Sequence, residues 1–495
     1  MNYLNLMLIC ICSSAFSQNV SLNWSDKIKT NGHEAIAGAY NETYYTRNIT
    51  KDKNLVFKIF DGQAHFKKEA NANFGLGKME YKYLGNHFLE KKIIHFLAET
   101  QRKKNKIYIY AAQTDVNFES VEETLVLNEL NYKNLSRDGI SFTPDSSKVV
   151  VWAELYGKNK NHANTIRYKV FDAQLHNILE DKTVVLTKAS KNMHVKSCLL
   201  DNYLNLYVIS EITKPKKEQK KTEANTYGNV TVFANNGEVK EIAYAFKSKT
   251  VNAFFSLTKD NNFLSTGFLS PIIKGFLKSK KGELVSDELF MMKYDCKTLL
   301  ETENKVISVN DLYPENVIKE SEYVPYKVQN VFELKDGTIS IVAEQYKSVY
   351  HSGHRGAGYF VYFHCDIAVI HLDKNLEVKS LVKMPKYQKD ARNPSLMSTS
   401  FKDKIYIIYE DKTKNEHINS DKEIKKSTAG FLTRDSDKSL FLITVNNKGE
   451  MKKNILFSYD QSNIRPDFSK SAVIKDGEIM LNATDYLGIL RINSI

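Results

Sequence analysis

The sequence predicts an all-β protein assembled from repeated units, and three observations support this prediction. One short pattern returns along the chain: an apolar strand, a turn of Asp, Asn, Lys or Gly, and a second strand that ends in an acidic residue. The 28 Tyr and 26 Phe, against 21 Gly and 8 Pro, favour strands over disorder. No helical period is long enough to supply crossovers between parallel strands. The pattern occurs at 142–156, 199–212, 332–346, 400–411 and 473–486.

The spacing of these units predicts how they are arranged. Most units contain a further strand that ends in Asp or Asn, then a turn and another strand, so each unit holds four short antiparallel strands. Four strands per unit are typical of a β-propeller blade rather than of a sandwich or a parallel sheet. The units begin near Gly32, His87, Ser141, Lys196, Val251, Val328, Ser395 and Phe468.

The first and last strands predict how the ring closes. The last unit, 472–495, contains only three strands, and the segment 19–28 stands apart from the first unit. This segment can supply the missing outermost strand, which removes an exposed sheet edge. The count then gives eight blades, or seven if residues 32–75 are a partial unit. We expect a single β-propeller domain over residues 18–495 with seven or eight four-stranded blades, eight being preferred, closed by the N-terminal strand.

Residues 1–17 form an apolar stretch that ends in Ala15, Phe16 and Ser17, with small residues where a signal peptidase reads them. They predict a secretory signal peptide. The usual Lys or Arg before the apolar run is missing, which leaves an uncleaved anchor as the alternative, but the run is short for a membrane span. No later segment is apolar enough to cross a bilayer. We therefore expect an exported protein, which is periplasmic, outer-membrane associated or extracellular.

Charge and cysteine content narrow the class of protein. The 70 Lys plus Arg exceed the 58 Asp plus Glu by 12, but much of the excess lies in solvated runs such as 214–221. Export and this scatter disfavour nucleic acid as a partner. The three cysteines after the signal, Cys198, Cys296 and Cys365, are too few and too scattered for a disulfide framework. We interpret them as small buried apolar residues.

Several stretches resemble known propellers. Residues 142–151, FTPDSSKVVV, resemble the SPDG-type turn of TolB-like propellers. The stretches 332–346, 366–388 and 402–416 are similar, in this order, to an uncharacterised family of secreted propellers common in Bacteroidota, whose members read GEQYY, NDIIVV, KIPKRQ and YFIFNDNPKN. The resemblance covers nearly the whole mature chain. It implies the fold and export, and it implies no activity.

One insertion contains a candidate metal site. Where members of that family often have a Tyr-rich insertion, this chain has HSGHRGAGYFVYFHCD at 351–366. Imidazole and thiolate are ligands that zinc prefers. Strand alternation would point His364 and Cys365 to opposite faces, and the spacing is not a recognised one, so we favour a Gly-rich insertion with incidental histidines. The low-priority candidates for a metal are His351, His354, His364 and Cys365.

A second candidate is the set of acidic residues that close successive second strands. Blade symmetry would place them at equivalent heights around the ring, where they could bind a cation or a cationic ligand. The alternative, which we favour, is that each braces its blade by accepting backbone hydrogen bonds or pairing with Lys. These residues are Asp115, Glu154, Glu211, Glu344, Glu410 and Asp485.

No other catalytic signature is present in the sequence. There is no G-x-S-x-G elbow, H-E-x-x-H helix, Walker loop or dinucleotide fingerprint, and we predict no catalytic residue and no cofactor, with a bound cation left open. We expect a monomeric binding or scaffold module at the cell envelope that contacts protein, glycan or peptide through inserted loops on one face. The alternative is a hydrolase or lyase that acts on polysaccharide or peptide at the central channel, with carboxylates drawn from distant blades.

Overall fold

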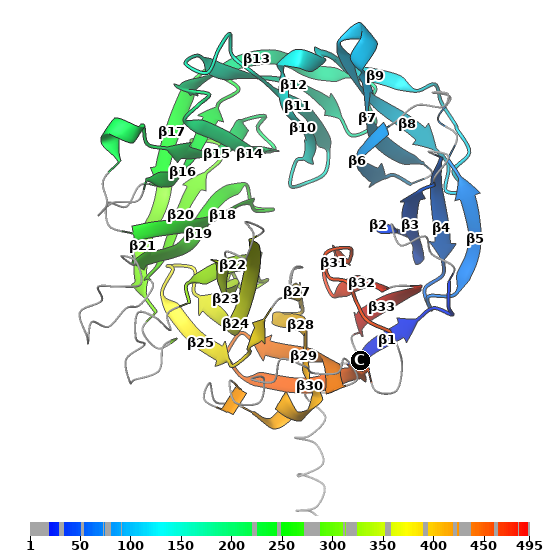
Figure 1. Cartoon of the computed structure of the whole chain (residues 1–495), viewed down its shortest axis with the longest axis vertical. Coiled ribbons are helices and arrows are strands. Elements are labelled where there is room, and N and C mark those ends of the chain that lie inside the picture. Colours follow the sequence, from blue (N-terminus) through cyan, green and yellow to red (C-terminus); the bar gives the residue numbers. More distant parts are fainter. Residues whose placement is uncertain are drawn as a thin grey trace, which may run out of the picture.

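Eight antiparallel sheets follow one another around a central axis and form a closed ring (Figure 1). Each sheet has four strands, and the sixth has one additional short strand. The computed structural model thus confirms the eight-bladed β-propeller expected from the repeats. It describes residues 19–493 apart from 29–33, 51–53, 73, 75–80, 91, 220–224, 245–248, 272–287, 310–311, 313–323, 352–357, 390–394, 419–422, 425–436, 460–463 and 484.

The strands of each blade are consecutive from the channel outward, except in the last blade. Blades 1 to 4 consist of β2 (Ala35–Tyr40), β3 (Thr43–Ile49), β4 (Leu55–Phe60), β5 (Phe66–Asn71); β6 (Tyr81–Phe88), β7 (Ile93–Gln101), β8 (Lys106–Thr114), β9 (Leu125–Asn131); β10 (Leu135–Phe142), β11 (Lys148–Leu155), β12 (Ala163–Asp172), β13 (Ile178–Ala189); and β14 (Met193–Leu200), β15 (Leu206–Thr213), β16 (Thr226–Phe233), β17 (Val239–Tyr244). Blades 5 to 8 consist of β18 (Lys249–Leu257), β19 (Asn262–Pro271), β20 (Glu288–Asp295), β21 (Glu301–Ser308); β22 (Tyr326–Glu333), β23 (Ile339–His351), β24 (Tyr359–Leu372), β25 (Val378–Met384), with β26 (Gln388–Lys389); β27 (Leu396–Phe401), β28 (Lys404–Lys412), β29 (Lys438–Asn446), β30 (Met451–Ser458); and β31 (Ala472–Lys475), β32 (Glu478–Ala483), β33 (Tyr486–Asn493), β1 (Asn19–Trp24). Short 3-10 turns occur at η2 (Arg102–Lys104), η3 (Tyr132–Asn134), η4 (Lys216–Glu218) and η7 (Thr413–His417).

The last blade is completed by the first strand of the chain, as predicted. β1 pairs antiparallel with β33, from Asn19 opposite Asn493 to Trp24 opposite Gly488. The Trp24 ring lies on Gly488, where a Cβ atom would come within 2.7 Å of the indole, so this close approach requires glycine. The ring is therefore held closed by main-chain pairing between segments far apart in the sequence.

The antiparallel order gives the ring two different faces. Every inner strand begins, and every second strand ends, on one side, which we call the hairpin face. On the opposite side, which we call the turn face, the third strand of a blade turns into the fourth. There an Asp carboxylate braces the turn: Asp61 accepts from the backbone N–H of Gln63 and His65, and Asp373 accepts from that of Asn375 and Glu377. These braced turns follow the predicted pattern of a strand that ends in Asp or Asn.

The core lies between neighbouring blades, where apolar faces of two sheets meet. One cluster joins Phe268 of blade 5 to Tyr326 and Ile341 of blade 6, all fully buried. Burying such a side chain contributes about 2 kcal/mol, so the packed sheets stabilise one another. The predicted burial of the cysteines is confirmed, since Cys198, Cys296 and Cys365 all lie in the protein interior.

The predicted signal peptide, residues 1–17, lies outside the described residues. Among the residues that the structure describes, no helix is long and apolar enough to cross a membrane.

Candidate functional site

The second and third strands of blade 6 extend beyond their sheet as a long hairpin. The inner strand β22 begins at Tyr326, opposite Gln345 of β23, whereas β23 and β24 remain paired from Tyr346 and His364 out to His351 and Tyr359. A register shift between Glu344 and Tyr346 marks the point where the hairpin leaves the blade. The hairpin therefore projects from the hairpin face.

Aromatic side chains follow the base of this hairpin. The rings of Tyr346 and Tyr362 stack with centroids 6.3 Å apart, and the Tyr346 ring also contacts His364 at 5.1 Å. The ammonium of Lys327 lies 5.6 Å from the centroid of the Tyr346 ring, at cation–π distance. Further out, Tyr350 is 55% exposed. The hairpin thus presents tyrosines to solvent above an ordered aromatic base.

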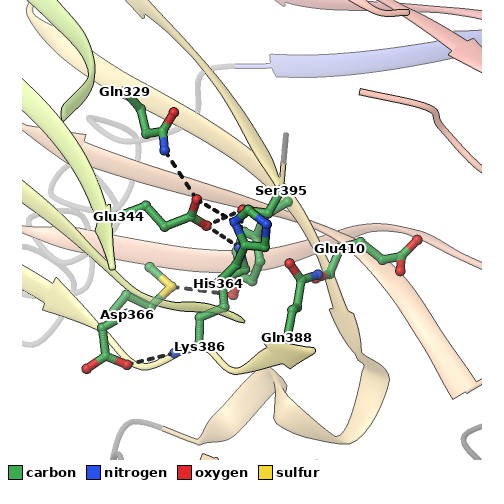
Figure 2. A network of polar contacts seen from close by, with 10 residues as sticks. Gln329, Glu344, His364, Asp366, Lys386, Gln388, Ser395 and Glu410 are labelled. Atoms are coloured by element: carbon green, nitrogen blue, oxygen red, sulfur yellow. Dashed lines mark hydrogen bonds and ion pairs between the residues drawn. The ribbon is translucent and has the colours of Figure 1, made fainter. Parts of the chain in front are cut away.

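A fully buried ion cluster lies directly beneath the hairpin (Figure 2). The Glu344 carboxylate is 2.5 Å from the Lys386 ammonium and 3.1 Å from Nδ1 of His364, and all three side chains are buried. Nε2 of Gln329 donates to the same carboxylate at 3.3 Å, and the Ser395 hydroxyl donates to its other oxygen. Each lone pair direction of the carboxylate is used, which makes its burial tolerable.

The cluster joins blade 6 to blade 7. Lys386 lies after the outermost strand β25, and its ammonium donates to the hydroxyl of Ser395 at 2.7 Å, just before β27 of the next blade. Two residues further on, β26 pairs with β24 at His364, and Gln388 donates to the main-chain oxygen of Glu410 in β28. The root of the hairpin is therefore fixed by side chains from two blades.

Charge pairing lowers the pKa of Glu344. Burial raises the pKa of Glu344, but Lys386 and His364 lower it by more, so that the pKa is about 2. Ser395 lies between the two charged groups: Nζ of Lys386 donates to its hydroxyl, and the hydroxyl donates to the Glu344 carboxylate. These contacts brace the root of the hairpin.

The four metal candidates of the sequence are not brought together in the described structure. His351 is the last residue of β23, and His354 lies outside the described residues. His364 turns to Glu344, and Cys365 follows it on the same strand, so strand alternation directs the two side chains to opposite faces. In the part of the chain that the structure describes, no group of three or more His, Cys, Asp or Glu side chains could hold a metal ion.

Four of the six acidic candidates lie at the ends of second strands but in different surroundings. Glu344 is part of the cluster, and Glu154 is buried and accepts from Nδ2 of Asn164 at 2.7 Å. Glu211 is exposed and lies 3.5 Å from Lys196, while Glu410 is half-buried and lies 2.6 Å from Lys438.

The acidic candidates do not all share one register in the described structure. Glu211 and Glu344 share one register, because each lies opposite an inner-strand residue that precedes the bulged residue by two positions. Glu154 instead lies opposite the residue that directly follows the bulged one. Asp485 lies in the turn between β32 and β33, with a left-handed φ of 66°. Bulges shift the strands by one residue, so equal sequence positions do not reach equal heights.

Asp115 needs a correction, because it follows the third strand of blade 2 rather than the second. Its carboxylate accepts from the backbone N–H of Asn117 at 2.7 Å and of Glu119 at 3.0 Å. It is therefore the turn-face brace of its blade, equivalent to Asp61 and Asp373. The second strand of blade 2 instead carries Glu99, which is buried and accepts from the hydroxyl of Tyr110 at 2.9 Å.

The sequence reasoning missed three members of the cluster: Gln329, Lys386 and Ser395. Lys386 lies in KMPKYQ, the stretch that resembles the KIPKRQ motif, so the resemblance contained its signal. Gln329 is the bulged residue of β22, since the register shifts between Val328 and Asn330. A bulge of this kind redirects one side chain and leaves no pattern in a single sequence.

Comparison with known proteins finds no family model that matches the chain and no curated protein that matches it. Solved propellers are similar in fold. The WD40 domain of SCAP from fission yeast is 10% identical, with 96% of this chain and 98% of that chain covered and a TM-score of 0.40. The β-propeller domain of the Trilobed protease from Pyrococcus furiosus is 11% identical, with 86% and 96% covered and a TM-score of 0.36. The BP39L lectin from Burkholderia pseudomallei is 9% identical, with 87% and 98% covered and a TM-score of 0.34.

Proposed function

We propose that this protein is an exported binding or scaffold module that contacts an envelope protein, glycan or peptide through its hairpin face. One observation carries the proposal: the long connections of the ring share one face. The connections at 214–225, 272–287 and 413–437 join second to third strands, and 309–325 joins a fourth strand to the next inner strand. In this topology all four leave the sheets on the hairpin face, as does the extended hairpin of β23 and β24.

The two faces and the two halves of the ring differ in these connections. On the turn face the strands are joined by connections of at most ten residues, the longest being 115–124. In blades 1 to 3 and 8 the second-to-third connections are only 50–54, 102–105, 156–162 and 484–485. Blades 4, 5 and 7 therefore carry the long second-to-third connections, and blade 6 carries the extended hairpin. Function in repeat proteins lies in such insertions, because the repeated scaffold positions them.

The blade 6 hairpin is the element that we assign to the principal contact. It combines exposed Tyr350 with the stacked Tyr346 and Tyr362, and the ion cluster of Glu344 and Lys386 holds its root rigid. Tyrosine supplies a large contact area with few rotatable bonds, and a rigid root lowers the entropic cost of binding.

The test of the binding surface uses the purified chain from residue 18 and immobilised fractions of cell envelope, separated into protein, glycan and peptide components. We expect one component to retain the wild-type protein and the double variant Tyr350→Ala, Tyr362→Ala to bind it at least tenfold more weakly. Tyr203→Ala is the matched control, since Tyr203 is 41% exposed but lies in a turn on the turn face. Turnover of a glycan or peptide without a retained partner would favour the hydrolase or lyase instead.

Export is tested separately by cell fractionation and sequencing of the mature N-terminus. We expect the protein outside the cytoplasm with its chain beginning at Gln18. The resemblance of 332–416 to secreted propellers and the apolar residues 1–17 support this expectation. A cytoplasmic protein that retains Met1 would contradict the envelope location and leave the binding test unaffected.

A further inference from the structure

The inner strands of blades 3 and 4 bring two basic side chains into direct contact. Nη2 of Arg137 on β10 lies 2.7 Å from Nε2 of His194 on β14. Arg137 is the third residue of its strand and His194 is the second residue of its strand, so the contact lies at the hairpin face, where both inner strands line the channel. A guanidinium only donates hydrogen bonds, so Nε2 of the imidazole is the acceptor in this contact.

The carboxylates closest in register do not neutralise this pair. Glu154 is the cross-strand partner of Arg137, but its side chain is buried and accepts from Asn164. Glu211 is the cross-strand partner of His194, but it lies 3.5 Å from Lys196. Among the described residues, no carboxylate oxygen lies within 4.0 Å of the Arg137 guanidinium.

The neighbouring cations are already paired, so they add no excess charge of their own. Lys82 on the inner strand of blade 2 lies 2.6 Å from Asp138, and Lys196 pairs with Glu211 as described. Among the described residues of this arc, Arg137 has no carboxylate partner, and it lies beside the imidazole of His194, which can also present an N–H donor. The two groups are held by separate sheets and lie close enough for one ligand group to contact both.

We propose that Arg137 and His194 bind an oxyanion, a carboxylate, sulfate or phosphate group of a ligand that enters the channel from the hairpin face. The planar guanidinium presents parallel N–H donors that match the oxygens of such a group, and the imidazole supplies a donor from the next blade. The anion takes the place of the Arg–His contact and neutralises the guanidinium. The site lies in blades 3 and 4, apart from the blade 6 hairpin, so it adds a ligand chemistry to the proposed function and does not depend on it.

The experiment is isothermal titration calorimetry of the full mature chain with sodium sulfate, sodium phosphate and a galacturonate oligosaccharide as three separate probes. The strongest of the three indicates whether sulfate, phosphate or carboxylate is preferred. We expect Arg137→Gln to weaken that binding at least tenfold, Arg137→Lys to weaken it less because the charge remains, and His194→Gln to weaken it about threefold. Arg167→Gln is the matched control, since Arg167 lies on β12 of the same blade, away from the inner strand.

A measurement on the wild-type chain guards against variants that fail to fold. The ring C–H resonances of His194, assigned in a selectively labelled sample, are expected to shift with the preferred anion and to saturate at the calorimetric affinity. Binding by Arg137→Gln as tight as that of the wild type would overturn the proposal. So would a wild type that binds none of the three probes, or His194 resonances that do not move.

Discussion

Blades 3 and 6 both contain Ala-Glu in their second strand, yet the two glutamates have different surroundings. Glu344 of blade 6 is fully buried and is contacted by Lys386, His364, Ser395 and Gln329. Glu154 of blade 3 is 2% exposed, and among the described residues only Asn164 donates to it, which leaves its Oε2 without a hydrogen bond.

The difference shows that the side chains in contact with the glutamate, rather than the glutamate itself, determine its structural role. In blade 6 a bulge redirects Gln329, and the segment after β25 returns Lys386 to the carboxylate. In blade 3 the bulge at Ser136 lies next to Arg137, the residue opposite Glu154, and among the described residues no lysine pairs with Glu154. The same two residues thus form a rigid brace in one blade and a poorly satisfied buried group in the other.

The largest expected effect comes from removing the cation of the blade 6 brace. Lys386→Met leaves Glu344 buried and unpaired, which destabilises the protein by about 3–5 kcal/mol. Urea unfolding followed by circular dichroism measures this loss. Lys196→Met is the control, because the pair of Lys196 with Glu211 is half exposed and contributes at most about 1 kcal/mol. Equal effects of the two substitutions would show that the cluster is not a brace.

The pH dependence of stability sharpens the comparison. The folded-state pKa of Glu344 is about 2, below its ordinary value of 4.5. The unfolded chain therefore takes up the proton first, so this contribution to stability is complete above the unfolded pKa and is lost as the pH falls through the range between the two values. Unfolding free energies measured across this range are expected to fall less steeply in Glu344→Gln than in the wild type. Parallel curves would contradict the lowered pKa.

A smaller effect is expected in blade 3. Glu154→Gln keeps an oxygen for the hydrogen bond from Asn164 and breaks no ion pair among the described residues, so we expect the free energy of unfolding to change by about 1 kcal/mol or less, in either direction. The same urea titration checks it, with Glu344→Gln measured in parallel. A loss in blade 3 as large as that in blade 6 would mean that the two glutamates have equivalent roles.

The smallest effect on stability is expected at the tip of the hairpin. Tyr350→Ala removes an exposed side chain beyond the brace, so the free energy of unfolding changes by about 0.5 kcal/mol or less. We expect this substitution to weaken ligand binding instead. Thermal unfolding of this variant beside the wild type separates the two roles, and a large drop in the midpoint would place Tyr350 in the folded core.

The sequence allowed the fold to be predicted because four-strand units and Asp-ended turns repeat at each blade. The closing strand could also be predicted, since 19–28 stands apart and the last unit lacks one strand. The cluster could not, because its members come from two blades and depend on a bulge at Gln329 that has no sequence pattern. Asp115 was placed on the wrong strand for a related reason: second and third strands both end in an acidic residue, and only the turn geometry distinguishes them.

Ring closure also determines the order in which the molecule can be completed. Of the eight described sheets, seven are made from consecutive strands, and they can form from nearby contacts alone. The eighth sheet is complete only when residues 486–493 pair with residues 19–24. Its formation therefore costs the conformational entropy of closing nearly the entire polypeptide into a loop. The pairing of β1 with β33 therefore holds the ring closed, and we expect the kinetic stability of the folded ring to depend on how slowly these two strands separate.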